Sequence, residues 1–104
     1  MPRTLSIDVL RQAAERLLDR AEQEFGPEID LDSQTIPIGF HWEIPLDQSF
    51  RMVDSPTTET GDIADDLSEI NELLTRPIDE TYLWHDLDHL TGLLRCIAFI
   101  ALPT

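Results

Sequence analysis

The chain contains no lysine, and its seven basic side chains, all arginines, are set against 21 acidic residues. The formal net charge of −14 argues against nucleic acid as a partner, because contact with phosphates requires clustered Lys and Arg. Anionic membrane surfaces are disfavoured for the same reason. The partners that fit this charge are basic proteins, cations, neutral surfaces and a second copy of the chain.

Cysteine and glycine are scarce as well, and their placement removes several classes of site. Cys96 is the only cysteine, so the chain can form no internal disulfide. It lies in an apolar stretch, where a thiol is normally buried and inert. The four glycines are too scattered to form a phosphate-binding loop, and the sequence has no Gly-x-Ser-x-Gly elbow. We therefore expect no enzyme and no organic cofactor.

Long apolar runs are also missing. The longest, residues 93–102, is interrupted by Arg95 and is too short to span a bilayer. Residues 1–8 contain no apolar core of the length found in signal peptides. These absences predict a cytoplasmic, bacterial-type protein without membrane contacts.

What the sequence does contain is periodic hydrophobicity, which indicates one folded domain over residues 1–104. The hydrophobic fraction of 41% lies above the range of disordered chains. The periods predict an α+β fold, with three helices packed on a small antiparallel β-ribbon in the order helix, strand, strand, helix, helix. The predicted elements are a helix over 6–25, a strand over 36–44, a second strand around Phe50, Met52 and Val53, a helix over 62–75, and a long apolar helix over 79–102.

The same periods predict which face of each element is buried. In the first strand Phe40 and Trp42 alternate with His41 and Glu43, so the aromatic face is expected to be buried. The helix over 62–75, with Thr60 as its cap, has an apolar stripe of Ile63, Leu67, Ile70 and Leu74. The stripe of the last helix is Leu83, Leu87, Leu90, Leu94, Ile97 and Ala101, although residues 93–102 also fit a buried strand.

The sharpest candidate for chemistry is a pair of histidines near the start of the last helix. His85 and His89 are one helical turn apart, and Asp88 is three residues from His85, so these side chains could bind one divalent metal. A further ligand would come from Asp86, from a carboxylate on the 62–75 helix, or from His41 and Glu43. The alternative is a pair of solvated histidines among acids, where protonation competes with metal.

Two surfaces are candidates for protein contact. The outer face of the 62–75 helix is expected to form an acidic ridge, which would attract a basic partner. Trp84 could anchor an interface, and the small residues of a second apolar face on the last helix would let another copy approach closely. The candidate interaction residues are Asp62, Asp65, Asp66, Glu69, Glu72, Trp84, Gly92, Cys96 and Phe99.

Three hypotheses of function follow from these features. The first is a small acidic, non-enzymatic interaction domain, such as an inhibitor or immunity-type binder of a basic protein. The second is a homodimeric structural or accessory domain. The third is a divalent-metal-binding protein that uses His85 and His89, with Asp88 as a further ligand.

Overall fold

The computed structural model describes residues 3–34, 38–52 and 54–103. The chain forms two compact units, Met1–Ser33 and Gln34–Thr104, and each is described by itself. The expectation of a single domain stays a prediction.

The first unit consists mainly of one amphipathic helix, α1 (Ile7–Phe25), as the sequence predicts. The Ser6 side chain caps the helix by accepting a hydrogen bond from the Val9 N–H at 3.1 Å. Gly26 ends the helix at φ 86°, a conformation that favours glycine, and its N–H donates to the Glu22 carbonyl. A 3₁₀ turn, Leu31–Ser33, follows.

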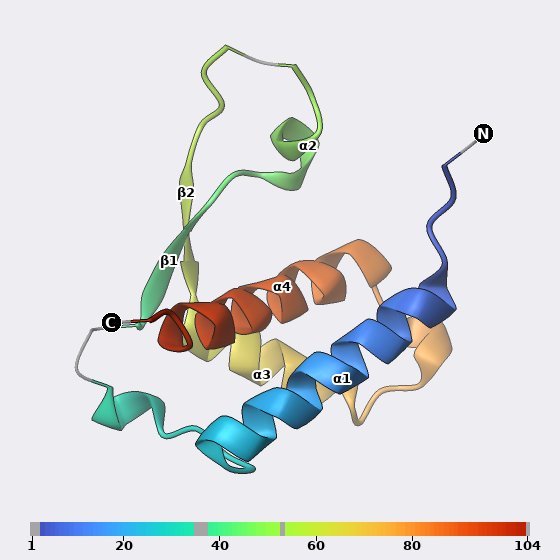
Figure 1. Cartoon of the computed structure of the whole chain (residues 1–104). Helices are drawn as coiled ribbons and strands as arrows, with labels where there is room; N and C mark the ends of the chain where they lie inside the picture. The colour runs from blue at the N-terminus through green and yellow to red at the C-terminus, as the bar shows by residue number, and fades with distance from the viewer. Residues whose placement is uncertain (1–2, 35–37, 53, 104) are drawn as a thin grey trace. The chain divides into compact units, whose positions relative to one another are not determined.

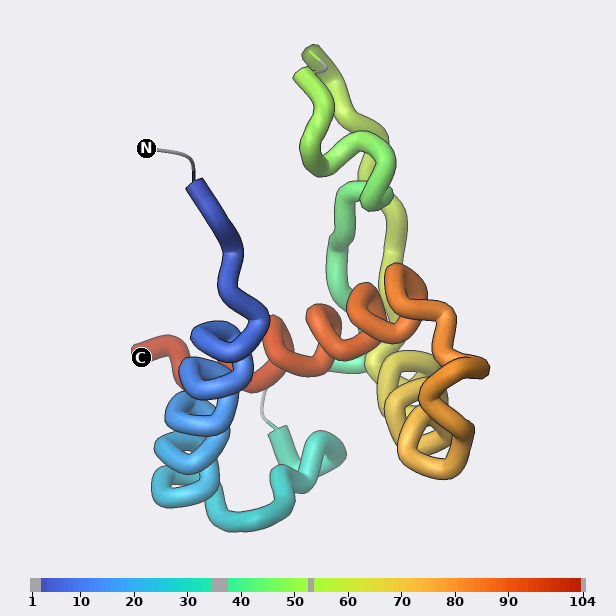
Figure 2. The backbone as a smooth tube through the Cα atoms, turned by 90° about the vertical axis from the view of Figure 1, so that its right-hand side faces the viewer, coloured from blue at the N-terminus to red at the C-terminus, as the bar shows by residue number. Residues whose placement is uncertain are grey.

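The second unit is a helical hairpin with a β-ribbon attached. The helices α3 and α4 pack against each other, and β2 runs directly into α3, so the ribbon begins at the hairpin and extends away from it (Figures 1 and 2). Its elements are β1 (Phe40–Glu43), α2 (Leu46–Ser49), β2 (Glu59–Asp62), α3 (Ile63–Leu73), a 3₁₀ turn (Ile78–Glu80) and α4 (Leu83–Ile100).

The α+β class is correct, but the described residues contain four α-helices rather than three. The additional helix, α2, lies between the two strands and makes the order helix, strand, helix, strand, helix, helix. None of the helices in the described residues is long and apolar enough to cross a membrane. Residues 35–37 and 53, which the strand predictions include, lie outside the described residues.

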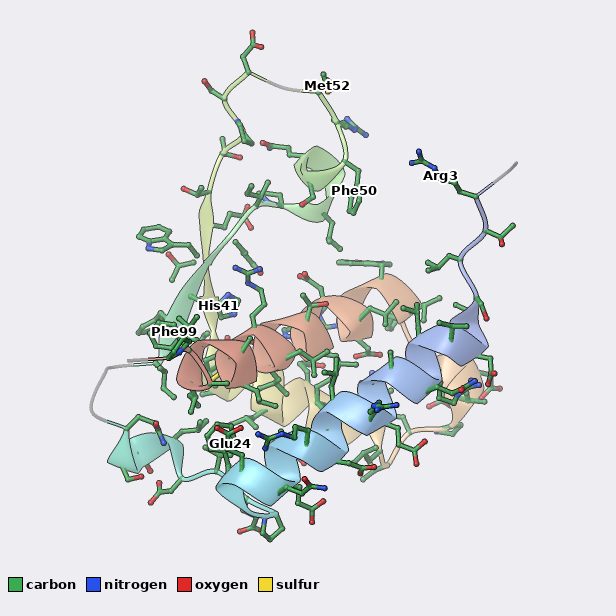
Figure 3. All side chains as sticks on the ribbon, viewed as in Figure 1. Arg3, Glu24, His41, Phe50, Met52 and Phe99 are labelled. Atoms are coloured by element: carbon green, nitrogen blue, oxygen red, sulfur yellow. The ribbon has the colours of Figure 1, made fainter. Side chains whose placement is uncertain are left out.

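The position of the second strand was predicted wrongly. It is Glu59–Asp62, antiparallel to β1, and not the segment around Phe50 and Met52. Local hydrogen bonds explain the difference, because the chain after Pro45 turns into α2 and the Gln48 side chain bonds both the N–H and the hydroxyl of Thr57. These contacts close the loop, and Phe50 and Met52 are left fully exposed near the far end of the ribbon (Figure 3).

The predicted faces of β1 are reversed. Phe40 and Trp42 are 70% and 75% exposed, whereas His41 and Glu43 are partly buried. Neighbouring side chains on a strand point to opposite faces, so burial of His41 requires exposure of Phe40 and Trp42. The polar contact of His41 with α3, described below, determines which face lies inside.

The predicted inward faces of α3 and α4 are also rotated. On α3 Ile63 is buried and Ile70 partly buried, as predicted, but Asp66 is buried as well, and Leu67 and the C-cap residue Leu74 are exposed. The N-cap is Asp62 instead of Thr60. On α4 the predicted leucine stripe is largely exposed, and the buried residues are Asp86, Gly92 and Cys96. The ion pairs and hydrogen bonds of Asp66 and Asp86 hold the faces that carry these two carboxylates inside. Hydrophobic periodicity alone predicts that the leucine faces are buried instead.

Candidate metal centre

Asp66, on α3, is a buried carboxylate at which histidines from two other elements meet. It is 5% exposed, and each of its oxygens has a histidine partner. His41 Nε2 from β1 lies 3.0 Å from Oδ2, and His89 Nδ1 from α4 lies 2.6 Å from Oδ1. A carboxylate accepts hydrogen bonds, so both ring nitrogens donate to it. Figure 3 shows His41 at the end of the ribbon that lies next to α4.

His89 and His85 face each other across one turn of α4. Because His89 Nδ1 donates to Asp66, the neutral ring carries its lone pair on Nε2, and this atom accepts a hydrogen bond from His85 Nε2–H at 3.2 Å. Two nitrogens bound to one tetrahedral zinc stand about 3.3 Å apart, since each Zn–N bond is about 2.0–2.1 Å. The two Nε2 atoms therefore have the spacing of ligands that share one ion, and an ion bound by both would replace the proton that now lies between them.

Glu69 supplies an oxygen at the same place. One carboxylate oxygen of Glu69 and one ring nitrogen each of His85 and His89 lie within 4.8 Å of one another, and all three residues are partly buried. Glu69 is three residues after Asp66 on α3, so both carboxylates lie on the helix face toward α4. We call Glu69, His85 and His89 the metal triad.

A second buried carboxylate, Asp86, lies next to His85 on the side of its Nδ1 atom. Its Oδ1 is 3.2 Å from Arg76 Nη2 and 3.8 Å from His85 Nδ1, and its Oδ2 has no hydrogen-bond partner among the described residues. Of the carboxylates Asp66, Glu69 and Asp86, Asp86 forms an ion pair with the guanidinium of Arg76. With neutral histidines this group carries an excess of negative charge, which a divalent cation would neutralise.

Asp88, predicted as the third ligand, is not part of the metal triad. It lines a groove with Glu43, Trp84 and Glu59 on the ribbon side of α4. Burial, together with the negative charge of Asp88, raises the pKa of the Glu43 carboxyl. The carboxylate that lies with the two histidines is Glu69 of the 62–75 helix, and a carboxylate of this helix is one of the alternatives that the sequence left open.

The acidic ridge predicted on α3 is not a uniform outer face. Asp62 caps the helix, Asp66 is buried, and Glu69 faces the two histidines, which leaves Asp65 and Glu72 exposed. The prediction that Asp66 lies on the surface is wrong, because its two histidine partners and its close approach to α4 hold it inside.

The other candidate interaction residues fall into two groups. Trp84 and Phe99 are 65% and 43% exposed, and the Trp84 ring meets the His85 ring edge-on at 5.5 Å between centroids. Gly92 and Cys96 are buried within the chain, Gly92 against Asp66 and His41. The prediction of a homodimer is not tested by these positions and stays a prediction.

Cys96 is buried, and burial raises the pKa of its thiol, with the negative charge of Asp66 as a smaller cause. Because only the thiolate reacts with alkylating reagents, we expect iodoacetamide to modify native Cys96 far more slowly than the denatured chain at the same neutral pH. Mass spectrometry of timed samples measures both rates, and the denatured chain is the control. Equal rates would contradict the burial of this side chain.

The sequence pattern predicts Asp66 on an exposed acidic face and assigns Arg76 no role, whereas the structure buries Asp66 between two histidines and pairs Arg76 with Asp86. The available signal was the pairing of two spacings, since Asp66 and Glu69 are three residues apart on one helix and His85 and His89 are four apart on the next. This signal becomes specific only when the two helices are known to pack together.

Comparison with known protein families, with curated proteins and with solved structures finds no match to this chain.

Proposed function

We propose that this protein is a small metal-binding domain in which Glu69, His85 and His89 bind one divalent ion of the zinc class. The observation that carries the proposal is the pair of Nε2 atoms 3.2 Å apart, with His89 held at its other nitrogen by Asp66. A carboxylate bonded to the far nitrogen of a ligating histidine is the usual outer-shell arrangement at zinc, where it fixes the tautomer and the ring orientation.

The ligand types favour zinc over magnesium or calcium. Two imidazoles and one carboxylate form a nitrogen-rich set that suits zinc and neighbouring transition metals, whereas magnesium and calcium prefer oxygen ligands. The His85 side chain is 38% exposed, so an ion can enter from solvent and water can take a fourth position.

The thin apolar core gives such an ion a structural role. Among the described residues only Ile63 and Cys96 are buried hydrophobic side chains, and two carboxylates are buried with them. Small domains with little apolar core often rely on a metal for stability. An ion bound by the metal triad would link α3 to α4 and balance their buried negative charge.

The same geometry ranks metal binding above the interaction hypothesis. Three of the five ridge acids have roles within the chain, as helix cap, as histidine partner or as candidate ligand. Binding of a basic partner and self-association stay predictions, and metal binding is compatible with both.

The test is a zinc titration of protein purified without a histidine tag and stripped with chelator. We expect one Zn²⁺ per chain by calorimetry, with stoichiometric binding lost in His85→Ala, in His89→Ala and in Glu69→Gln. Zinc should also raise the melting temperature of the wild-type chain, because an ion that binds only the folded state stabilises it by about 2.7 kcal/mol at a free concentration of 100 times Kd.

Asp88→Asn is the matched control, since Asp88 lies on α4 with both histidines but outside the metal triad. It should bind zinc as the wild type does. Loss of binding in Asp88→Asn together with full binding in Glu69→Gln would reject the triad in favour of the sequence-based ligand set. Absence of zinc binding by the wild-type chain would reject the proposed function.

A further inference from the structure

The third histidine of the chain, His41, reaches the site from the ribbon but lies outside the metal triad. Its Nε2 donates to Asp66 Oδ2, while His89 Nδ1 donates to Asp66 Oδ1. Hydrogen bonds therefore connect β1 through α3 to α4, and on α4 they continue from His89 Nε2 to His85 Nε2. The His41 side chain is 20% exposed and that of Asp66 is 7% exposed, so the contact is partly shielded from water.

The packing around this contact depends on two glycines from different elements. Gly61 is the partner of His41 in the ribbon register, and a Cβ on Gly61 would collide with the His41 ring. A Cβ on Gly92 of α4 would collide with Asp66 Oδ2 and would lie 3.0 Å from His41 Nε2. His41 and Asp66 thus occupy space that side chains at these two positions would fill.

We propose that His41 is a positioning residue for the metal triad and that, through Asp66, it couples metal binding to the docking of the ribbon on the helices. This inference rests on the proposed function. A carboxylate bonded at one oxygen can rotate, whereas Asp66 is held at both. A fixed Asp66 keeps His89 in the Nδ1–H tautomer with Nε2 turned to the ion.

The coupling must act in both directions. If the docked ribbon raises metal affinity through His41 and Asp66, then the bound metal stabilises the docked ribbon by the same factor. The proposal thus makes the docking of the ribbon depend on the metal, although no ribbon residue belongs to the metal triad.

The first test compares His41→Phe and His41→Gln with the wild-type chain. Phe keeps the ring volume and removes the donor, whereas the Gln amide can donate from near the position of Nε2. We expect His41→Phe to bind one Zn²⁺ per chain with a Kd about 10- to 100-fold higher, the usual effect of losing an outer-shell partner. The visible spectrum of bound Co²⁺ should change in His41→Phe, and His41→Gln should recover most of the affinity and the spectrum.

Trp42→Ala is the matched control, because Trp42 follows His41 on β1 and points to the exposed face. It should leave the zinc Kd and the Co²⁺ spectrum unchanged. Circular dichroism of each zinc-loaded variant checks that a weakened Kd does not reflect an unfolded chain.

The second test uses the unaltered chain, so it does not depend on how a variant folds. Hydrogen exchange of the β1 and β2 amides should slow by about 5- to 150-fold when Zn²⁺ is added, the range of ordinary coupling energies. Zinc binding with unchanged ribbon exchange, or a His41→Phe chain with wild-type Kd and Co²⁺ spectrum, would overturn the role of His41 and leave the proposed function intact. A wild-type chain that binds no zinc would overturn both.

Discussion

Asp66→Ala is expected to lower the free energy of unfolding by about 2–4 kcal/mol in the absence of metal. The change removes the acceptor of two histidine N–H groups from an interior site, and each buried donor left without a partner costs about 1–3 kcal/mol. The histidine side chains are each 20% exposed, so water recovers part of this loss. Urea unfolding in the presence of chelator, followed by circular dichroism, measures the difference.

Asp65→Ala is the control, since Asp65 is the neighbouring acid on α3 and is exposed. Its stability should stay within about 0.5 kcal/mol of the wild type, as for most exposed positions. Asp66→Asn should fall between the two, because an amide oxygen can accept one histidine N–H while its NH₂ group faces the other. Equal stability of the Asp66→Ala and Asp65→Ala chains would show that the buried carboxylate does not hold β1 and α4 on α3.

The sequence was most informative where structure is local. α1 is bounded by Ser6 and Gly26, and both are recognisable because a serine cap and a left-handed glycine act within a few residues. β2 carried no such signal. Its residues Glu59–Asp62 are polar and lack alternation, so their pairing with β1 depends on long-range contacts that the pattern does not contain.

The inward faces of α3 and α4 could be predicted only in part from hydrophobicity. Periodicity assumes that apolar side chains are buried, yet Asp66 and Asp86 are 5% and 4% exposed while Leu74 and Leu83 are 79% and 68% exposed. A buried carboxylate requires a partner, and the partners lie 10 to 25 residues away, at Arg76, His89 and His41. The pairing becomes visible only in the folded chain.

In the candidate site, too, the contacts within one helix could be predicted from the sequence and the contacts between helices could not. The His85–His89 spacing belongs to one helix and was recognised, and the structure brings their Nε2 atoms together. The choice between Asp88 and Glu69 depends on how α3 meets α4, and in the structure an oxygen of Glu69 lies within 4.8 Å of a ring nitrogen of each histidine. Asp66 was assigned to a solvated face, because nothing adjacent to it in sequence shows that two histidines approach it.

Gly92→Ala is expected to destabilise the chain, although alanine is the better residue for a helix. In the middle of an exposed helix this change would add about 1 kcal/mol of stability. At position 92 the new Cβ would collide with Asp66 Oδ2, and overpacking of this kind costs about 1–3 kcal/mol. Displacement of Asp66 would also break its hydrogen bond to His41, so we expect a net loss of about 1–2 kcal/mol. Urea unfolding in chelator measures it.

Two comparisons separate this collision from other effects of the substitution. Gly39→Ala is the glycine control, because a Cβ there meets nothing within 4 Å, and its stability should be unchanged or higher by up to about 1 kcal/mol. The second comparison places Gly92→Ala in the Asp66→Ala background, where the colliding oxygen is gone. There the alanine should no longer destabilise, which gives a favourable interaction energy between the two substitutions. If Gly92→Ala instead stabilises the wild-type chain, α4 does not lie against Asp66, and Asp66 does not hold His89 through the hydrogen bond between them.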